Sequence, residues 1–236
     1  MYRVLISAPY LQRDFEAYRG EFVARGIVPF LPRVVERLEE PDLLAVIADY
    51  DGIICGDDRI TARVIDAAVR LKVIVKWGTG IDSIDKVYAA SKGIPVFNTP
   101  NAFTEPVSDS VLALMLSFAR QIIPSDRILK QGGWDKRIGF CLCEKTLGVI
   151  GIGNIGRAVA RKARGFGMRI LGNDIKEIPA TVTQELGIIM VSLERLLREA
   201  DIISINCDLN PTSYHLISER QFALMKPDAI IINTAR

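Results

Sequence analysis

Three glycines that follow a short apolar run carry the clearest chemical signal in this sequence. Gly151, Gly153 and Gly156 come directly after residues 145–150 and open an Ala-rich amphipathic stretch. With this spacing between a strand and a helix, the first glycine permits a tight turn, the second admits a pyrophosphate close to the backbone, and the third lets helix pack on strand. The N–H groups of Asn154 and Ile155 then lie at the positive end of the helix and can hold the phosphate.

A carboxylate follows where nucleotide binding requires one. Asp174 ends the β-rich run 168–174, close to the ~20-residue spacing expected after the glycines for the acid that binds an adenine ribose. A carboxylate accepts hydrogen bonds from both ribose hydroxyls and repels a 2′-phosphate, so the sequence favours NAD over NADP. S-adenosylmethionine presents the same ribose diol and is the rival ligand. Without any ligand, the same residues would form an ordinary turn and a strand-end cap.

The elements that position these residues alternate along the whole chain. Residues 1–98 predict a complete small α/β domain with a parallel sheet, and residues 99–236 predict a dinucleotide-binding Rossmann domain. Expected strands are 3–7, 27–31, 52–55, 72–76 and 95–97 in the first domain, then 145–150, 168–174, 188–191, 202–206 and 229–233 in the second. Expected helices are 12–25, 41–49, 61–70, 83–92, 104–120, 192–199 and 218–225. The fold class is therefore α/β, with two doubly wound parallel-sheet domains, the first flavodoxin-like.

Composition narrows the class of protein. The chain is 49% hydrophobic and 25% charged, and its 30 basic and 28 acidic residues are mixed to a net charge of +2. We therefore expect neither a nucleic-acid partner nor an anionic membrane surface. No apolar run reaches the ~18 residues of a membrane span, and the N-terminus lacks a signal-peptide layout. Four cysteines without a Cys-x-x-Cys pair and one histidine predict no metal site and a reducing, cytoplasmic location.

A second glycine loop follows the fourth strand of the first domain. Gly78, Thr79 and Gly80 lie beyond the carboxyl end of residues 72–76, where open α/β sheets bind ligands. Glycines on both sides of Thr79 would leave backbone N–H groups able to hold a small carboxylate. A plain strand-to-helix turn accounts for the same three residues.

A strongly apolar helix is expected between the domains. Thr104 is a candidate N-cap, and residues 104–120 are apolar on nearly every face, which predicts burial all round. Residues 124–144 are expected to form an exposed arm or linker. Since a helix buried on all faces needs a partner surface, we expect this helix to lie at an interdomain or subunit interface. We also expect a homodimer through this helix and the arm.

In order along the chain, these segments resemble the D-2-hydroxyacid dehydrogenase family. The resemblance covers essentially all 236 residues, and its most specific part is Ile232-Asn-Thr-Ala-Arg236 after a Met-Lys-Pro turn. The resemblance implies a two-domain NAD enzyme that transfers a hydride between nicotinamide and the α-carbon of a D-2-hydroxy or 2-keto acid. Other matching segments are Lys76-Trp-Gly-Thr-Gly-Ile-Asp-Ser-Ile-Asp, Asn98-Thr-Pro, Ala200-Asp-Ile-Ile-Ser, Leu216-Ile-Ser-Glu-Arg and Met225-Lys-Pro-Asp-Ala.

The resemblance also implies roles for individual residues. Arg236 matches the catalytic arginine, whose guanidinium can fork onto the substrate carboxylate and the keto oxygen. The backbone of Gly78, Thr79 and Gly80 matches the loop that binds the carboxylate, with Thr79 also near the nicotinamide. The implied cofactor contacts are Gly151, Gly153, Asn154, Ile155, Gly156, Asp174, Cys207, Thr212, Thr234 and Ala235.

Two segments depart from the family pattern. Asn206-Cys207-Asp208 stands where the family usually has His-x-Pro, so the loop beside the adenine can pack differently. Cys55-Gly56-Asp57-Asp58 stands where many phosphoglycerate-oxidising members carry Arg-Ser. The two carboxylates disfavour 3-phosphoglycerate, although Arg59 and Lys76 offer compensating charge.

The family's general acid, a histidine, and its glutamate partner lie beyond the Asn-Thr-Ala-Arg236 segment. The only histidine, His215, matches a structural position before a helix, and the final strand of the NAD sheet is also expected after residue 236. We therefore expect a dehydrogenase whose chain is cut short. The alternative is a catalytically inactive NAD(H)-binding regulatory module of the same fold.

Overall fold

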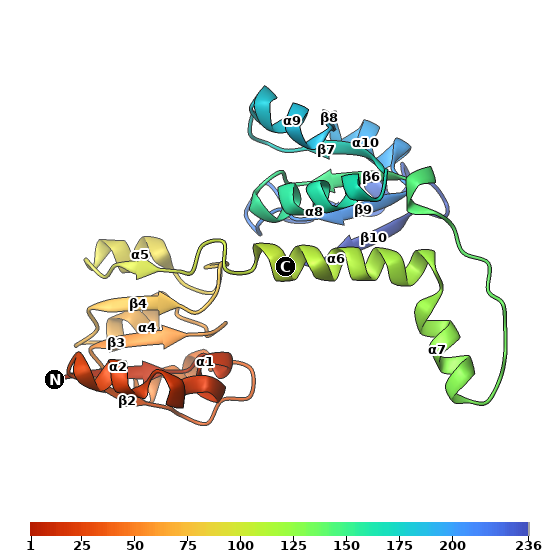
Figure 1. The fold of residues 1–236 in the computed structure, drawn as a ribbon. Helices are drawn as coiled ribbons and strands as arrows, with labels where there is room; N and C mark the ends of the chain where they lie inside the picture. The colour runs from red at the N-terminus through yellow and green to blue at the C-terminus, as the bar shows by residue number, and fades with distance from the viewer. Residues whose placement is uncertain (236) are drawn as a thin grey trace. The chain divides into compact units, whose positions relative to one another are not determined.

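Two five-stranded parallel sheets organise the protein (Figure 1). A computed structural model describes residues 1–235, and the chain divides into two compact units, Met1–Ala102 and Phe103–Arg236. The division falls after Ala102 rather than after residue 98, where we expected it. The expectation of an α/β protein with two parallel-sheet units is confirmed.

The first unit has the strand order β2-β1-β3-β4-β5. Its apolar side chains pack on both faces of the sheet, as expected for parallel strands that read as continuous hydrophobic runs. Helices α3, α4 and α5 pack on one face, and α1 and α2 pack on the other. The elements are β1 (Tyr2–Ile6), α1 (Pro9–Asp14), α2 (Arg19–Ala24), β2 (Ile27–Phe30), α3 (Glu40–Leu44), β3 (Gly52–Cys55), α4 (Ala62–Ala67), β4 (Val73–Lys76), α5 (Lys86–Ser91) and β5 (Val96–Phe97).

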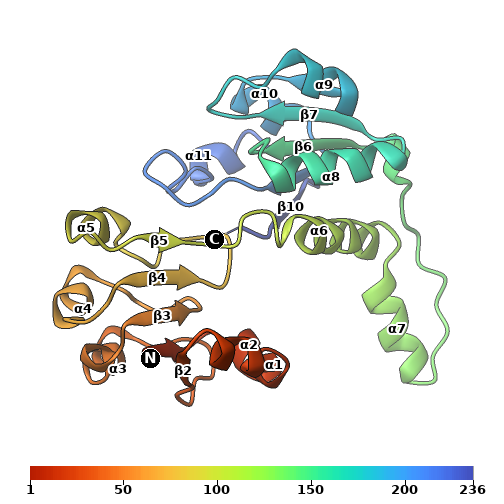
Figure 2. The ribbon, with the colours of Figure 1, turned by 60° about the vertical axis from the view of Figure 1, so that its left-hand side comes forward.

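The second unit has the strand order β10-β9-β6-β7-β8. Helices α6 and α8 share the core on one face of this sheet, as Figure 2 shows, while α10 packs on the opposite face. The elements are α6 (Thr104–Ala119), α7 (Ile122–Lys130), β6 (Thr146–Ile150), α8 (Asn154–Gly165), β7 (Arg169–Asn173), α9 (Ala180–Leu186), β8 (Ile188–Met190), α10 (Leu193–Glu199), β9 (Ile202–Ile205), α11 (Glu219–Phe222) and β10 (Ile230–Asn233).

The strand order reverses once in each sheet. In the first unit the chain leaves β1 for β2 on one side and later enters β3 on the other, and in the second unit β7 and β9 flank β6 in the same way. Such reversals open a crevice outside the carboxyl ends of the strands. Candidate binding sites are therefore expected after β1 and β3, and after β6 and β9.

Several expected helices differ from the structure. Residues 12–25 form two short helices separated by the 3₁₀ turn Phe15–Ala17, because Phe15 turns into the core and is only 1% exposed. Residues 41–49 likewise divide into α3 and the 3₁₀ turn Ile47–Asp49. Helix α9 was not expected at all.

The helix predicted at residues 104–120 is present as α6, but two details were wrong. Phe103 rather than Thr104 is the N-cap, because Thr104 already has helical backbone and no side chain caps the helix. The helix buries one face only. Met115 is fully buried, whereas Leu114 and Phe118 on the other face are 40% and 52% exposed.

The expected arm at residues 124–144 begins as helix. Helix α7 includes Pro124, which is tolerated in a first turn, and residues 131–138 beyond it are exposed. No single helix among residues 1–235 is long and apolar enough to cross a membrane. Helices α6 and α7, bent by 65° from one another, meet that test only as a pair, by length and composition alone.

Candidate functional site

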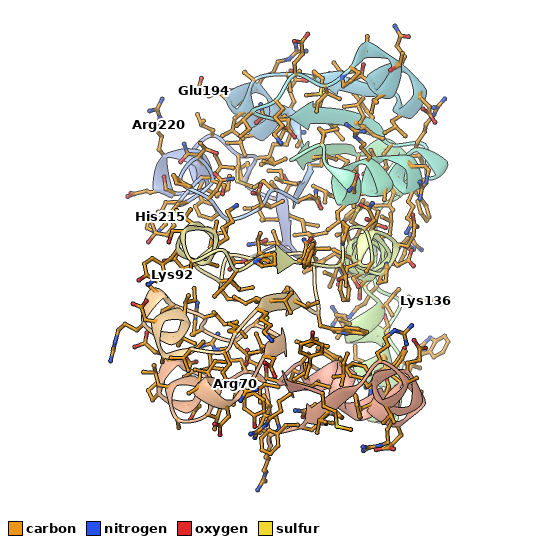
Figure 3. The ribbon with its side chains drawn as sticks, turned by 90° about the vertical axis from the view of Figure 1, so that its left-hand side faces the viewer. Arg70, Lys92, Lys136, Glu194, His215 and Arg220 are labelled. Carbon is orange, nitrogen blue, oxygen red and sulfur yellow. The ribbon has the colours of Figure 1, made fainter. Side chains whose placement is uncertain are left out.

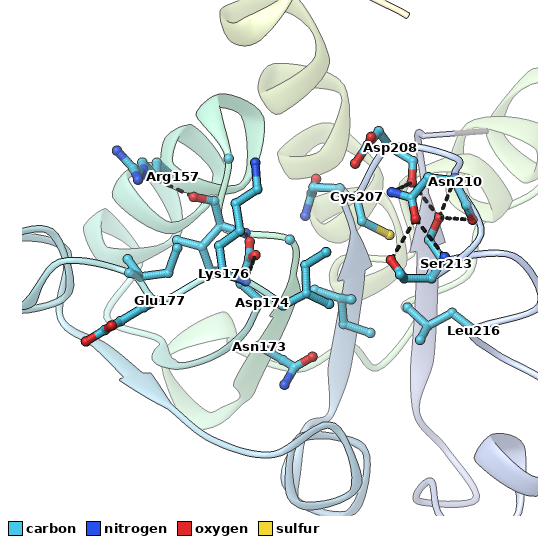
Figure 4. Close-up of a pocket in the computed structure, with 18 residues that line it drawn as sticks. Arg157, Asn173, Asp174, Lys176, Glu177, Cys207, Asp208, Asn210, Ser213 and Leu216 are labelled. Carbon is cyan, nitrogen blue, oxygen red and sulfur yellow. Dashed lines mark hydrogen bonds between the residues drawn. The ribbon is translucent and has the colours of Figure 1, made fainter. Parts of the chain in front are cut away.

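A cavity of about 410 Å³ opens at the carboxyl ends of β6, β7 and β9, where the strand order reverses (Figure 4). Asp174 and Lys176 on one side face Cys207, Asp208 and Asn210 on the other. Its floor is the glycine turn after β6. The cavity therefore contains the segments in which the sequence placed a dinucleotide.

The glycine turn works as its spacing predicted. Gly151 has φ +88°, and a Cβ there would lie 2.7 Å from the backbone nitrogen of Cys207, so only glycine fits. A Cβ on Gly156 would collide with the carbonyl oxygen of Gly151, because helix and strand are in direct backbone contact. A Cβ on Gly153 would meet nothing within 4 Å, so the space above it is open to a ligand.

The N-terminus of α8 faces this space. Gly153 is the N-cap, and its carbonyl accepts from the N–H of Arg157 at 2.9 Å, so the N–H groups of residues 154–156 point toward the helix end. Arg157 also lines the cavity, and its Nε donates to the carbonyl of Ile152 at 3.0 Å. Oriented N–H groups and a tethered guanidinium together favour a bound phosphate.

Asp174 is fixed in place by the turn that it faces. One carboxylate oxygen accepts from the N–H of Ile152 at 2.6 Å, and the other accepts from the N–H of Lys176 at 2.8 Å. An ionised carboxylate has about four acceptor positions, so these two bonds leave capacity for the hydroxyls of a ribose. The position supports the predicted ribose contact.

The far wall of the cavity is a loop held by its own side chains. The Thr212 hydroxyl donates to the side-chain oxygen of Asn210 at 2.6 Å, and the Ser213 hydroxyl donates to the carbonyl of Asp208 at 2.5 Å. Burial raises the pKa of the Cys207 thiol, and the charges of Asp208 and Asp174 raise it further. The Cys207 thiol therefore stays protonated near neutral pH and lines the cavity as an uncharged group.

The structure brings together five of the predicted cofactor residues, and the others lie elsewhere. Asn154, Ile155 and Gly156 lie in the adjoining first turn of α8. Thr234 and Ala235 follow β10 and do not line the cavity. Arg236 lies outside the described residues. The five that line the cavity are Gly151, Gly153, Asp174, Cys207 and Thr212.

His215 does not belong to this wall. Its side chain is exposed and stacks on the ring of Tyr214 with centroids 4.1 Å apart, on the segment before α11 (Figure 3). Its φ of +54° is uncommon outside glycine. Both rings lie outside the set that lines the cavity.

Sequence reasoning missed Arg157, Lys176 and Asn210. A signal existed for Arg157, because a cation in the first turn of a helix opposes the helix dipole and needs a separate reason. The sequence contains no such signal for Lys176 and Asn210. They line the cavity only because the loops after β7 and β9 lie next to the turn after β6.

The second glycine loop lies at the carboxyl end of β4 in the first unit. The carbonyl of Gly78 accepts from the N–H of Thr99 at 2.9 Å, and the carbonyl of Thr79 accepts from the side-chain amide of Asn98 at 2.8 Å. These bonds fix the loop backbone beside Gly80. A fixed run of backbone N–H groups at this edge of the sheet can hold a small carboxylate.

Comparison with known proteins identifies the family. Residues 112–236 match the family described as D-isomer specific 2-hydroxyacid dehydrogenase, NAD binding domain. The chain therefore belongs to the D-isomer specific 2-hydroxyacid dehydrogenase family. The resemblance seen in the sequence and the predicted cofactor, NAD, are confirmed.

Individual relatives act on different acids. The chain is 38% identical over 204 residues to a glyoxylate reductase of Thermococcus onnurineus, covering 82% of this chain and 61% of that protein. It is 41% identical over 207 residues to a D-3-phosphoglycerate dehydrogenase of Methanocaldococcus jannaschii, covering 86% of this chain and 39% of that protein. Among solved structures, a D-lactate dehydrogenase of Aquifex aeolicus complexed with NAD and lactic acid matches with a TM-score of 0.88 at 27% identity, covering 99% of this chain and 69% of that one.

The glycine turn predicts different outcomes for two matched substitutions. Gly156→Ala should destabilise the second unit by about 1–3 kcal/mol, because the new methyl group has no room. Gly153→Ala should leave unfolding nearly unchanged and weaken NADH binding, because its methyl group enters the open space. Denaturant unfolding and NADH fluorescence titration measure the two effects. Equal losses of stability would contradict the assignment of distinct roles.

The geometry of Asp174 predicts a change in cofactor preference. Asp174→Ala should lower the affinity for NADH and reduce the difference between the affinities for NADH and NADPH. The variant loses both the acceptor for the ribose hydroxyls and the charge that repels a 2′-phosphate. Parallel titrations of the two nucleotides against wild type and variant measure the ratio of the two dissociation constants. An unchanged preference would mean that Asp174 only holds the turn.

Proposed function

We propose that this protein is an NAD-dependent oxidoreductase that transfers a hydride between nicotinamide and the α-carbon of a D-2-hydroxy or 2-keto acid. The observation that carries the proposal is the cavity after β6, β7 and β9, in which the glycine turn and Asp174 meet. Membership of the D-isomer specific 2-hydroxyacid dehydrogenase family supports it. The chain spans 61% of the length of the first relative described above, so the activity of the whole protein is part of the proposal.

The second unit binds the cofactor in this proposal. The outward N–H groups at the start of α8, with Arg157 beside them, hold the pyrophosphate. Asp174 accepts the hydroxyls of the adenine ribose, while Cys207 and Thr212 line the rest of the nucleotide. Asn154, Ile155, Thr234 and Ala235 keep their roles as further cofactor contacts, proposed from the family resemblance.

The first unit binds the acid. The backbone of Gly78, Thr79 and Gly80 holds the substrate carboxylate, and Thr79 keeps the cofactor contact that the family resemblance implies. Arg236 forks onto the carboxylate and the keto oxygen and stabilises the charge that develops as hydride adds. His215 has no part in the chemistry, since its ring is exposed and stacked on Tyr214.

A reducing cytoplasm suits the cysteines of this chain. Cys55, Cys141, Cys143 and Cys207 are all free thiols, and Cys141 and Cys143 are exposed. Exposed free thiols persist most readily where thiol reductants are present. We therefore propose a cytoplasmic location, with a small-molecule acid as the substrate.

The activity is tested by following NADH oxidation with glyoxylate, hydroxypyruvate and pyruvate. We expect turnover of at least one acid, and we expect Arg236→Lys to lower kcat by about 10²-fold or more, because lysine keeps the charge and loses the planar fork. NADH binding should be unchanged in this variant. The complete protein is the one to assay.

Other results would reject specific parts of the proposal. Tight NADH binding without turnover of any 2-keto acid would favour an inactive NAD(H)-binding regulatory module. Preference for S-adenosylmethionine over NADH in a competition titration would reject the cofactor. Near-normal turnover in Arg236→Lys would reject the role of that residue alone.

The exposed apolar side chains of α6 and α7 support a homodimer. Leu114, Phe118, Ile122 and Ile123 are between 40% and 59% exposed, and the opposite face of α6 fills the core of its own unit. Phe118→Arg should convert a dimer into a monomer at micromolar concentration, measured by light scattering. Phe166→Arg is the matched control, because Phe166 is a similarly exposed phenylalanine after α8. A monomeric wild type would reject the dimer.

A further inference from the structure

Buried polar side chains gather at the carboxyl ends of β1, β3 and β4 in the first unit. Ser7, Asp58 and Lys76 are at most 2% exposed, although serine, aspartate and lysine usually lie at the surface. They lie where the strand order reverses between β1 and β3, beside the Gly78 loop. Cys55 is buried among them, and burial raises the pKa of its thiol to about 12, so it stays protonated.

Asp58 fixes the loop that follows β3. One of its oxygens accepts from the Ser7 hydroxyl at 2.7 Å and from the N–H of Gly56 at 2.9 Å, while the other accepts from the N–H of Leu38 at 2.5 Å. Burial raises the pKa of this carboxyl, and the three hydrogen bonds oppose that rise. The loop is thereby tied to β1 and to the segment before α3, so the carboxylate of the preceding residue has a defined position.

The preceding residue is Asp57, and its carboxylate pairs with Lys76. The Lys76 ammonium donates to the Asp57 carboxylate and to the carbonyl of Gly56. The Lys76 side chain is buried, whereas the Asp57 side chain is 39% exposed. A buried ammonium is costly unless it is paired, so Asp57 supplies the charge that Lys76 requires and turns part of its own surface toward solvent.

Lys76 also lies directly against the proposed substrate loop. Its Cε is 3.0 Å from the place where a Cβ on Gly78 would stand, so the aliphatic chain runs along the backbone of that residue. Without Asp57, a cation would stand within reach of the loop that holds the substrate carboxylate. Such a cation would attract a second anionic group on the same substrate.

We propose that Asp57 selects substrates by their charge. Because Asp57 pairs with the ammonium of Lys76, the first unit binds 2-keto acids with a single anionic group in preference to acids with two. Acids with a second carboxylate or a phosphate meet the exposed edge of Asp57 and find the Lys76 ammonium already paired. The inference rests on the proposed function, in which the Gly78–Gly80 backbone binds the substrate carboxylate. Both members of the Asp57–Lys76 pair belong to the first unit.

Phosphate binding tests the pair without any turnover. Asp57→Asn keeps an oxygen acceptor for Lys76 and removes the charge, so inorganic phosphate should raise its melting temperature by about 2–4 °C more than that of wild type. The double variant Asp57→Asn/Lys76→Met should lose this response. Glu36→Gln is the matched control, because it removes one exposed negative charge from the same loop region without touching Lys76.

Substrate selectivity gives the second measurement. The ratio of kcat/KM for oxaloacetate to that for glyoxylate should rise at least about tenfold in Asp57→Asn, and return to the wild-type ratio in the double variant. Glu36→Gln should not change the ratio. Should Asp57→Asn fail to fold, Asp57→Ser offers a hydroxyl acceptor and the same loss of charge.

The outcomes separate the two proposals. A wild type that turns over no 2-keto acid would reject the proposed function, while the phosphate response would still test the Asp57–Lys76 pair. An active wild type whose Asp57 variants show neither a phosphate response nor a changed ratio would overturn the inference. Wild type that already prefers the doubly charged acid would also overturn it.

Discussion

Direct contact between backbones at the glycine turn is the constraint on which the second unit depends. The helix after β6 can pack on its strand only because Gly156 has no Cβ to collide with the carbonyl of Gly151. The segment after β9 can pack against the turn only because Gly151 also has no Cβ. Two close approaches thus converge on one residue. They bring the helix end, Asp174 and the far loop around a single cavity, so the binding geometry follows from packing rather than from long side chains.

In the first unit, buried polar and charged side chains hold the strand ends together where the strand order reverses. Its strand order also reverses once, but the carboxyl ends there are joined by a buried network centred on Asp58 and Lys76. Buried polar groups of this kind are tolerable only when every member has partners. In the proposed function the two units have different roles. The second offers backbone N–H groups and space for a large nucleotide, and the first offers a rigid sheet edge for a small acid.

The sequence predicted those parts of the fold that depend on neighbours along the chain. The glycine spacing and Asp174 are local patterns, and the strands were found because parallel strands read as short apolar runs. What failed depends on the rest of the fold. Local cap preference favours Thr104, yet Phe103 is the N-cap. The break at Phe15 exists because that ring enters the core. Lys176 and Asn210 reach the cavity through loops whose path no periodicity encodes.

The bond between Asp174 and the N–H of Ile152 has a kinetic and entropic consequence. The carboxylate is already anchored to the turn before any nucleotide arrives, so its rotamer is not selected during binding. Immobilising a free side chain typically costs about 0.5–1.5 kcal/mol, and that cost was met when the protein folded. If Asp174 binds the ribose as proposed, the site is preorganised at that end. Discrimination between nucleotides is therefore expected at the first encounter, without a slower rearrangement of this residue.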